Sequence, residues 1–281
     1  MAGGVGSRLY PISTPERPKQ FLDLLGCGKS LIRLTYERFM EVDPDALVWV
    51  VTSASYTHFV REQIPEIPAC RILAEPASRN TAPCIAYACR KISMHYPDAN
   101  IVVTPADAYV PDAKAFAKTI RLALDFTSAG NSIVCIGIKP DSPHTGYGYI
   151  QAPASPETVE KVISFKEKPS LEVAQGYLAE GGYWWNAGIF VWTAQCIEEE
   201  LRTYAPQICG IMDELEPCLY TEGETEALER LFPLCEKISI DYAVMEKSDK
   251  VYTLAAEWEW SDLGSFEAIE KITGKDPRKS L

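Results

Sequence analysis

Short apolar runs rich in β-branched residues alternate with amphipathic stretches in the first half of the chain. The apolar runs lie at 47–51, 70–73, 100–104 and 131–138. Between them, apolar residues recur with helical spacing at about 30–42, 55–64, 81–95 and 112–128. Short apolar strands that alternate with helices are typical of a parallel sheet covered on both faces. We therefore expect an α/β fold with a doubly wound, mostly parallel, Rossmann-like sheet, whose ligands bind at the carboxyl ends of the strands.

The pattern changes near residue 146. Segments 146–151 and 159–168 alternate apolar and polar residues, as solvent-facing antiparallel strands do, and an aromatic-rich segment follows at 183–192. We expect a small antiparallel subdomain here. The remaining pattern predicts helices over about 194–247, a strand at 251–255 and a last helix near 264–272.

Length and composition favour one continuous catalytic domain over residues 1–281. Hydrophobic residues make up 47% of the chain and charged residues 23%, without a repeat or a low-complexity tract, so a disordered chain is disfavoured. Within the domain, the change of pattern separates a half at about 1–140 from a half at about 141–281.

The charge of the chain excludes one class of partner and favours another. A formal net charge of -12 argues against a surface that binds nucleic acid, because such a surface needs clustered positive charge. Residues 1–40 nevertheless hold six basic and three acidic residues. This local excess suits a small anionic ligand, although a solvated basic face explains the charge equally well.

The cysteines and the lack of long apolar runs predict a cytoplasmic location. Nine cysteines are an odd number, with no C-x-x-C pair and no histidine at a zinc-ligand spacing, so we expect reduced thiols. The chain has no leader-like start, and no apolar run approaches the roughly 18 residues that a membrane helix needs. We therefore expect no membrane association.

A glycine-rich segment opens the chain and is a candidate phosphate loop. Gly3, Gly4 and Gly6 allow close approach of the backbone to phosphates, and Arg8 adds a fork of donors. A surface turn is the alternative. The segment P-K-Q-F at 18–21 strengthens the loop reading, because Lys19 adds a second cation.

Two other phosphate-binding motifs fail on spacing. GKS at 28–30 lacks the earlier glycine of a P-loop, since Asp23 stands there. Gly4-Val5-Gly6 is followed by Leu9 where a dinucleotide motif needs glycine, which disfavours a dinucleotide-dependent oxidoreductase.

Eight collinear segments resemble the sugar nucleotidyltransferase family, and within it the mannose-1-phosphate guanylyltransferases. They are G-G-V-G-S-R-L-Y-P-I-S with P-K-Q-F, E-P-A-S-R-N-T-A-P, T-P-A-D, T-G-Y-G-Y-I, F-K-E-K-P, W-N-A-G-I-F, S-I-D-Y-A-V-M-E-K and W-S-D-L-G-S-F. They cover nearly the whole chain. The resemblance implies transfer of GMP from GTP to mannose 1-phosphate, giving GDP-mannose and pyrophosphate with the help of Mg²⁺. It also assigns the first half to the nucleotide and the second half to the sugar phosphate.

The resemblance places the nucleotide base at Glu75, Asn80 and Thr81. Glu75 ends a predicted strand at the ligand edge of the sheet. Asn80 and Thr81 begin a predicted helix, whose free N–H groups favour an anion or a base edge. A plain helix cap without a ligand is the alternative.

Asp107 and Asp262 are the candidate metal ligands. Asp107 follows a predicted strand, and Asp262 lies in a loop between Trp260 and Gly264. Two carboxylates without a nearby histidine suit a hard cation such as Mg²⁺. Each aspartate alone is more often a turn or cap residue, and the resemblance makes both of them Mg²⁺ ligands.

Five residues are candidates for the sugar phosphate. Gly146 would let the backbone lie against the sugar, and Glu167 could accept hydrogen bonds from its hydroxyls. Lys168 could reach the phosphate, and the resemblance places Asn186, near Gly188, at the hexose. A buried asparagine that satisfies the backbone and an exposed Glu–Lys ion pair are the alternatives.

The implied reaction is an in-line displacement at the α-phosphorus of GTP. The attacking phosphate is already an anion, so no general base is needed, and none of the three histidines lies in the matching segments. Arg8, Lys19 and Mg²⁺ would neutralise the charge that builds on pyrophosphate. Asp241 and Glu246, which follow a capping residue at Ser239, are expected to be structural or to support the ligand-binding residues.

The sequence departs from the family pattern in three places. No apolar strand precedes Ala2, so we expect exposed core and a poorly anchored phosphate loop. Ala108 stands where the family usually has histidine, and the chain ends soon after its last predicted helix, so we expect no β-helix or isomerase domain.

Two rival functions stay open. One is a sugar nucleotidyltransferase for another base or hexose, and the other is a non-catalytic paralogue that binds a nucleotide sugar. Whether two copies form a homodimer is also left open.

Overall fold

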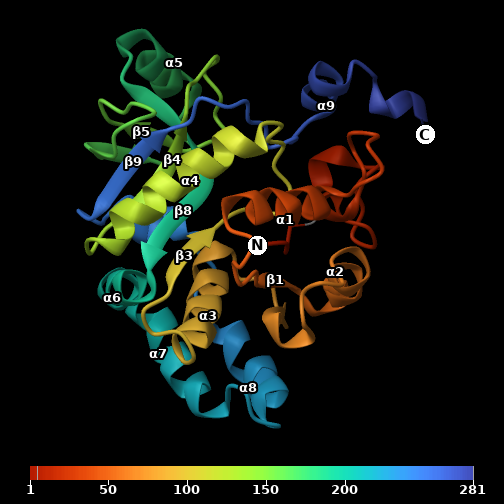
Figure 1. Cartoon of the computed structure of the whole chain (residues 1–281), viewed down its shortest axis with the longest axis vertical. Coiled ribbons are helices and arrows are strands. Elements are labelled where there is room, and N and C mark those ends of the chain that lie inside the picture. The colour runs from red at the N-terminus through yellow and green to blue at the C-terminus, as the bar shows by residue number, and fades with distance from the viewer. Residues whose placement is uncertain (5, 281) are drawn as a thin grey trace. The chain divides into compact units, whose positions relative to one another are not determined.

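The computed structural model describes residues 1–4 and 6–280, with side chains up to residue 278. The chain divides into two units, each built from segments that are distant in sequence (Figure 1). The first unit comprises Met1–Ala74, Pro105–Lys118 and Trp258–Leu281, and the second comprises Glu75–Thr104 and Thr119–Glu257. The expected division into a nucleotide half and a sugar half concerns function and stays a prediction.

The first unit contains three complete helices and a two-stranded sheet among its described residues. The helices are α1 (Leu31–Val42), α2 (Thr57–Gln63) and α9 (Phe266–Thr273). The paired strands are β1 (Val50–Ser53) and β2 (Ile72–Glu75), whose last residue opens the second unit. Side-chain oxygens of Ser30 and Ser265 cap α1 and α9, because each satisfies a backbone N–H that the first helical turn leaves free.

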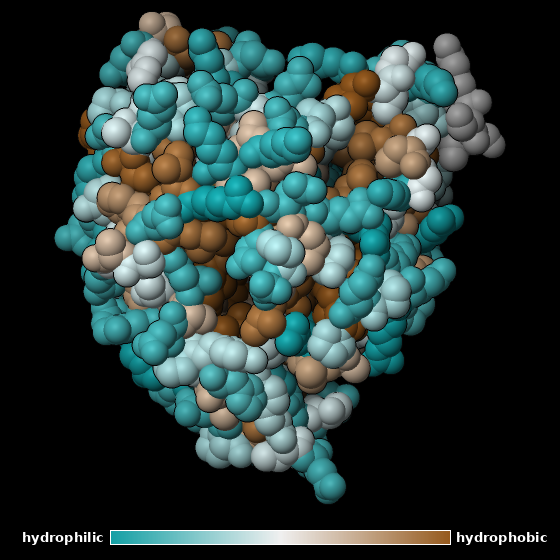
Figure 2. Space-filling model, in the orientation of Figure 1, coloured by the Kyte–Doolittle hydropathy of each residue, from teal (hydrophilic) through white to brown (hydrophobic). Residues whose placement is uncertain are grey.

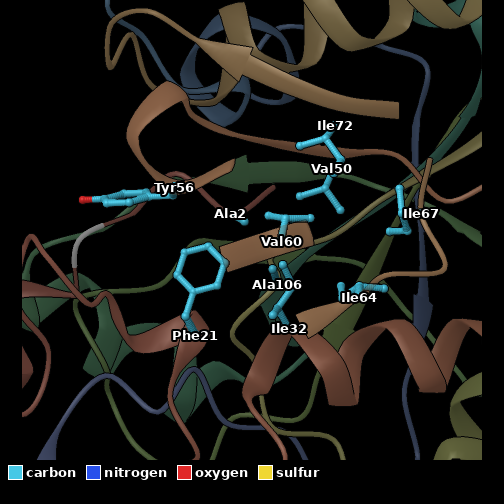
Figure 3. Close-up of a cluster of buried hydrophobic side chains, with 10 residues drawn as sticks. All are labelled: Ala2, Phe21, Ile32, Val50, Tyr56, Val60, Ile64, Ile67, Ile72 and Ala106. Atoms are coloured by element: carbon cyan, nitrogen blue, oxygen red, sulfur yellow. The ribbon is translucent and has the colours of Figure 1, made fainter. Parts of the chain in front are cut away.

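A cluster of buried apolar side chains holds the first unit together. Figure 3 shows Phe21 and Ile32 near Val60 and Ile64 of α2. Phe21 is 1% exposed, and burying such a side chain contributes about 1.5–3 kcal/mol. Since Phe21 belongs to the predicted P-K-Q-F segment, this packing anchors the segment that carries Lys19.

Met1 and Ala2 form backbone hydrogen bonds with two other segments of the first unit, one at Val51 and one at Ala106. Ala2 N–H donates to the Val51 carbonyl at 2.8 Å, and Ala106 N–H donates to the Met1 carbonyl at 2.9 Å. Ala2 is 3% exposed and packs in the apolar cluster. The expectation of a poorly anchored phosphate loop is therefore wrong, because these two residues join the loop to two neighbouring segments.

The second unit is built on a sheet of seven strands among the described residues. Its order is β6-β9-β4-β8-β5-β7, and β3 also pairs with β8. The strands are β3 (Asn100–Val103), β4 (Ile133–Ile138), β5 (Tyr149–Gln151), β6 (Glu160–Lys161), β7 (Ser164–Lys166), β8 (Tyr183–Thr193) and β9 (Val251–Ala255). β4 is buried at every position, as its apolar run predicts.

Strand β8 runs antiparallel to β3, β4 and β5, whereas β4 and β9 are parallel. β3 and β4 therefore run in one direction, with β8 reversed between them. An apolar run does not reveal the direction of its strand. The sequence pattern therefore assigned the aromatic segment 183–192 to the antiparallel subdomain and did not predict its pairing with β3 and β4. The α/β, Rossmann-like fold class is confirmed, but the expectation of a mostly parallel sheet is wrong for these seven described strands, because β8 runs antiparallel to its neighbours and only β4 and β9 pair in parallel. Strand β8 links the subdomain strand β5 to β3 and β4.

The helices of the second unit pack around this sheet and on one another. They are α3 (Thr81–Ser93), α5 (Leu171–Glu180), α6 (Ala194–Tyr204), α7 (Pro206–Leu215) and α8 (Glu224–Leu231), together with a π-helix at Asp241–Met245. A further helix, α4 (Ala113–Ser128), begins in the first unit and ends in the second. In Figure 1, α3 lies beside α6 and α7.

A buried arginine joins three of these segments. The Arg90 guanidinium of α3 lies 2.7 Å from Glu198 of α6 and 2.9 Å from Asp213 of α7. Removing one partner of such a buried pair leaves an uncompensated charge, so we regard this network as structural.

The surface and the thiols agree with the composition. Figure 2 shows hydrophilic residues over most of the visible face, with hydrophobic residues between them. All nine cysteines are free, as predicted. Among the described residues, every helix is too short or too polar to cross a bilayer.

Candidate functional site

The glycine-rich loop needs glycine at position 6. Gly6 has φ 59°, and a Cβ there would lie 2.7 Å from Ser13 Oγ and 3.0 Å from Lys19 Cβ. Gly3 and Gly4 are exposed, and a Cβ on Gly4 would meet nothing within 4 Å. The third glycine is thus the one that the fold requires. Val5 lies outside the described residues.

Gln20 closes the loop, and the sequence reasoning missed it. Its Nε2 donates to the carbonyls of Ala2 at 2.8 Å and Gly4 at 2.9 Å, and the residue is 2% exposed. Both amide hydrogens are therefore used, which fixes the loop against the segment that carries Lys19. The available signal was an amide within the P-K-Q-F block, next to the predicted cation.

Lys19 lies at the centre of a first cluster of polar residues, which comprises Arg8, Lys19, Asp107 and Asp262. Its side chain is 7% exposed, and its Nζ lies 3.2 Å from Asp107 Oδ2. The same ammonium donates to the backbone carbonyl of Asp262 and lies 3.5 Å from that of Leu263. One buried cation thus holds both aspartate-bearing loops.

A pair of backbone hydrogen bonds brings the two aspartates together, although they are far apart in sequence. Tyr109 N–H donates to the Ser261 carbonyl at 2.8 Å, and Ser261 N–H donates to the Tyr109 carbonyl at 3.1 Å. Asp107 lies two residues before this bridge and Asp262 immediately after it. The two loops that carry Asp107 and Asp262 are therefore held side by side by this bridge.

Arg8 completes the first cluster. Its Nη2 lies 3.4 Å from Asp262 Oδ2, and its side chain is 67% exposed. Gly264 N–H donates to Asp262 Oδ1 at 3.0 Å, and a Cβ on Gly264 would overlap this carboxylate and press against Arg8. The structure thus brings together Arg8, Lys19, Asp107 and Asp262, the four predicted catalytic residues, within the first unit.

The chemistry of this donor set fits a hard cation that also binds a ligand. Among the described residues, no group of three or more His, Cys, Asp or Glu side chains could hold a metal ion. Asp107 and Asp262 supply two carboxylates, and Mg²⁺ is commonly bound by one or two carboxylates together with phosphate oxygens and waters. The buried, uncharged side chain of Ala108 adds no ligand.

Glu75 is a buried carboxyl group with one unused oxygen. The residue is 8% exposed, and its Oε1 has no hydrogen-bond partner. Burial raises its pKa to about 7, although a hydrogen bond from the Cys84 thiol opposes the rise. A buried acceptor without a partner indicates a place for a donor from a ligand.

Asn80 caps α3, as predicted. Its Oδ1 accepts the Thr81 N–H at 2.8 Å, with the Asn80 backbone at φ 70°. Thr81 Oγ1 accepts the Ile240 N–H at 2.9 Å, so its hydroxyl ties α3 to the segment before the π-helix. The two residues therefore fix the start of α3 in the second unit.

A second cluster of polar residues surrounds Glu167 and Asn186, and the glycine that lies against these two residues is Gly148 and not Gly146. A Cβ on Gly148 would lie 2.6 Å from Glu167 Oε2 and 3.2 Å from Asn186 Cβ. A Cβ on Gly146 would meet only the ring of His144, and the Gly146 N–H donates to His144 Nδ1 at 3.1 Å. The two glycines are equivalent in the motif, so only the folded geometry separates them.

Glu167 and Lys168 form a partly buried pair after β7. Lys168 Nζ donates to Glu167 Oε1 at 2.6 Å, with Glu167 6% exposed. Burial opposes the charge on Lys168, but the hydrogen bond and the charge of Glu167 raise its pKa overall. Lys168 has φ 45°, a conformation that costs about 1–3 kcal/mol for a residue other than glycine. The chain thus accepts strain to place this pair.

Asn186 is held by two hydrogen bonds, one of them to Asp241, which was expected to be structural or to support the ligand-binding residues. Its Nδ2 donates to Asp241 Oδ1 at 2.9 Å, and its Oδ1 accepts the Gly188 N–H at 2.9 Å. Gly188 has φ 70°, which favours glycine. Burial, followed by the charge of Glu167, raises the pKa of Asp241 to about 6.

Glu246 also contacts the second cluster. Its Oε1 accepts the backbone N–H of Glu167 at 2.8 Å and lies 3.5 Å from Lys166 Nζ. The second cluster, which comprises Gly148, Glu167, Lys168, Asn186 and Asp241, therefore joins β8 and the π-helix to the residues next to β5 and β7. Of the predicted sugar residues, Gly146 alone lies apart from it.

Comparisons with known proteins agree on one family. A sequence profile described as nucleotidyl transferase matches residues 1–279. The mannose-1-phosphate guanylyltransferase of Escherichia coli (strain K12) is 37% identical over 287 residues, which is 97% of this chain and 59% of that protein. Mannose-1-phosphate guanylyltransferase ManC of Salmonella typhimurium is 36% identical over 295 residues, or 100% and 60%.

A solved structure is similar as well. The mannose-1-phosphate geranyltransferase from Thermus thermophilus has a TM-score of 0.86 and 31% identity, covering 99% of this chain and 78% of that chain. The chain spans about three fifths of the length of the curated relatives that it matches.

Proposed function

The chain belongs to the nucleotidyl transferase family, and from this premise we propose that it transfers GMP from GTP to mannose 1-phosphate. The products would be GDP-mannose and pyrophosphate. Relatives named mannose-1-phosphate guanylyltransferase support the two substrates. The observation that carries the proposal is the first cluster, in which Lys19 holds Asp107 and the Asp262 loop together.

The first cluster suits a triphosphate because Arg8 can exchange its partner and Lys19 is already positioned. Arg8 is largely exposed and 3.4 Å from Asp262, so this pair is weak and a phosphate can take the place of the carboxylate. Lys19 is buried and already positioned, so it needs little reorganisation as charge builds on pyrophosphate. The two groups would align the triphosphate and neutralise the leaving group.

Asp107 and Asp262 would hold Mg²⁺ together with the phosphates. When bound, the metal would supply positive charge that stabilises the phosphates as negative charge builds on them. The attacking oxygen of mannose 1-phosphate is already an anion, so no residue of the chain has to remove a proton. A bond forms from this oxygen to the α-phosphorus, and the bond to pyrophosphate breaks.

Glu75 supports guanine as the base. The Watson–Crick edge of guanine carries two neighbouring N–H donors, and Glu75 Oε1 is a buried acceptor without a partner. Adenine and uracil do not present the same pair of donors. Asn80 and Thr81 would fix the start of α3 beside the base, whose edge can face backbone N–H groups.

The second cluster supports a hexose 1-phosphate. Gly148 leaves space in front of Glu167, whose carboxylate can accept sugar hydroxyls. Lys168 offers an ammonium that is about half exposed, which suits the phosphate. Asn186 and Gly188 hold the shape of β8 at this point.

A substrate panel tests the proposal. Purified protein is mixed with Mg²⁺, one of four nucleoside triphosphates, and mannose, glucose or N-acetylglucosamine 1-phosphate, and released pyrophosphate is measured. We expect the highest kcat/KM with GTP and mannose 1-phosphate, and none in EDTA. A higher value with another pair would assign the chain to a different sugar nucleotide, and no release from any pair would indicate a binding paralogue. A cytoplasmic location stays part of the proposal.

A further inference from the structure

Half of the hydrogen-bonding capacity of Asn186, which the resemblance placed at the hexose, is already used within the protein. Both heavy atoms of its amide already form hydrogen bonds, to Asp241 and to Gly188. The residue is 9% exposed. The two fixed bonds leave one amide hydrogen and one oxygen lone pair for a ligand. They also hold the Asp241 carboxylate in one orientation.

Asp241 remains partly exposed and begins the π-helix. The Glu246 N–H donates to the Asp241 carbonyl at 3.0 Å, a hydrogen bond across five residues. π-helical turns are rare and occur frequently at functional sites. Because Glu246 also accepts the Glu167 N–H, the turn is tied at both ends to residues of the second cluster.

The charges around Asp241 suit a polyol that carries one phosphate. The charge of Glu167 disfavours the charge of Asp241, and Lys168 is the cation beside them. Hydroxyl groups donate hydrogen bonds to carboxylates, and bonds to a charged acceptor are stronger than bonds between neutral groups. A neutral sugar ring relieves the two carboxylates, whereas a second anion would not.

We infer that Asp241 accepts a hydrogen bond from a ring hydroxyl of the hexose and that Asn186 is its positioning residue. This inference rests on the proposed function, because it names a contact within the same sugar site. The ligand must then be a hexose 1-phosphate in which the ring hydroxyl that donates to Asp241 is unmodified. Analogues that lack this hydroxyl leave the carboxylate without its donor.

The test compares Asp241→Asn with Asp249→Asn, which makes the same charge change at an exposed turn. Calorimetry at pH 7.5 gives the Kd of mannose 1-phosphate and of its monodeoxy analogues. We expect the Kd of mannose 1-phosphate to rise about 10- to 100-fold in Asp241→Asn, the usual effect of losing a hydrogen bond to a charged group. The Kd of the Asp249→Asn control should change less than about twofold.

The analogue series separates recognition from a structural role. In the wild type, one monodeoxy analogue should bind about 10- to 100-fold more weakly than mannose 1-phosphate. In Asp241→Asn the two should bind alike, and Asn186→Ala should reduce the same discrimination. Equal discrimination in wild type and Asp241→Asn overturns the inference. If Asp241→Asn does not fold, as judged by thermal unfolding, Asp241→Ser is tested in the same series.

Binding is measured without turnover, so the two proposals can fail separately. Weaker sugar binding in Asp241→Asn, with no pyrophosphate released from GTP by the wild type, rejects the proposed reaction and supports Asp241. Turnover of GTP and mannose 1-phosphate that is unchanged in Asp241→Asn supports the reaction and rejects Asp241. Absence of sugar phosphate binding by the wild type rejects both.

Discussion

The two clusters use polar groups in different ways. In the first cluster, each carboxylate faces a cation, and Arg8 is 67% exposed. In the second, the Asn186 amide donates to Asp241 and accepts from the Gly188 N–H, and the carboxylate of Glu167 is buried. The exposed Arg8–Asp262 pair can exchange partners at little cost, whereas a buried amide network keeps its shape. The first cluster therefore suits a charged ligand, and the second suits a ligand that is recognised by the positions of its hydroxyl groups.

The charges of the clusters point the same way. Arg8 and Lys19 balance Asp107 and Asp262, so a phosphate and a divalent cation can enter the first cluster together. In the second, Lys168 faces Glu167 and Asp241, which leaves an excess of acceptors for hydroxyl groups. Loss of a charge should therefore act mainly on the rate in the first cluster and on sugar binding in the second.

Removal of the buried cation should have the largest effect. We expect Lys19→Ala to lower kcat/KM for pyrophosphate release about 10²–10³-fold, because a preorganised positive group is lost where charge develops. Lys29→Ala removes an exposed lysine paired with Glu37 and is the control. Since Lys19 is buried, thermal unfolding of both variants is measured as well. Full turnover by a folded Lys19→Ala would separate the first cluster from the triphosphate.

Glu75→Gln should come next in size. We expect kcat/KM with GTP to fall about 10- to 100-fold, because guanine loses a charged acceptor. The ratio of kcat/KM for GTP to that for ATP should fall with it. Glu62→Gln, at an exposed position of α2, serves as the control. An unchanged ratio would show that Glu75 does not read the base.

The same variant should gain stability at alkaline pH. The pKa of Glu75 is raised from its usual 4.5 to about 7, so the folded chain holds this proton more tightly than the unfolded chain. The free energy of unfolding therefore falls as pH rises between these values. Denaturant unfolding at pH 8 should find Glu75→Gln about 1–3 kcal/mol more stable than the wild type. Equal pH dependence of the two proteins would contradict this linkage.

A matched pair of glycine variants sharpens the description of the second cluster. Gly148→Ala puts a Cβ 2.6 Å from Glu167 Oε2, so we expect KM for mannose 1-phosphate to rise about tenfold as this carboxylate is displaced. Gly146→Ala meets only a His144 ring that can turn away, so its KM should change less than about twofold. The reverse order of effects would restore Gly146 as the sugar-side glycine.

The smallest expected effect is a pH dependence of sugar binding. The pKa of Asp241 is raised to about 6 by burial and by Glu167, with Lys168, Tyr242 and Ser239 also near it. Below this pH the protonated carboxyl is a weaker acceptor, so the Kd of mannose 1-phosphate should rise several-fold from pH 7.5 to 5. The phosphate of the sugar also titrates near pH 6, so the profile of Asp241→Asn is subtracted. Identical profiles would argue against this titration.

Local signals in the sequence predicted most of the elements and the first cluster. The start of α3 at Thr81, with its Asn80 cap, follows from residue types, as does the buried strand β4. Asp107 and Asp262 were named from motifs, but their meeting depends on the Tyr109–Ser261 bridge. No pattern along the chain specifies that pairing.

The rest depends on contacts that sequence spacing does not contain. Strand β8 was expected only as part of an added subdomain, because an apolar run carries no information on direction. Gly146 and Gly148 differ only in what their missing side chains would touch. Asp241 was expected to be structural or to support the ligand-binding residues, and its contact with Asn186 fits the second of these roles. The π-helix that positions it leaves no distinct residue pattern, so this particular contact was not predictable.

The five residues from Asp241 to Met245 form a turn that accommodates one residue more than an α-helix would. Deleting one of them would restore ordinary α-helical spacing, and each residue of an α-helix turns the chain by about 100°. The carboxylate would then swing away from the amide that orients it. The π-helical turn is thus less regular than an α-helix, but it keeps Asp241 in contact with Asn186. A deletion of one residue in this turn would therefore alter the choice of hexose without any substitution in the strands.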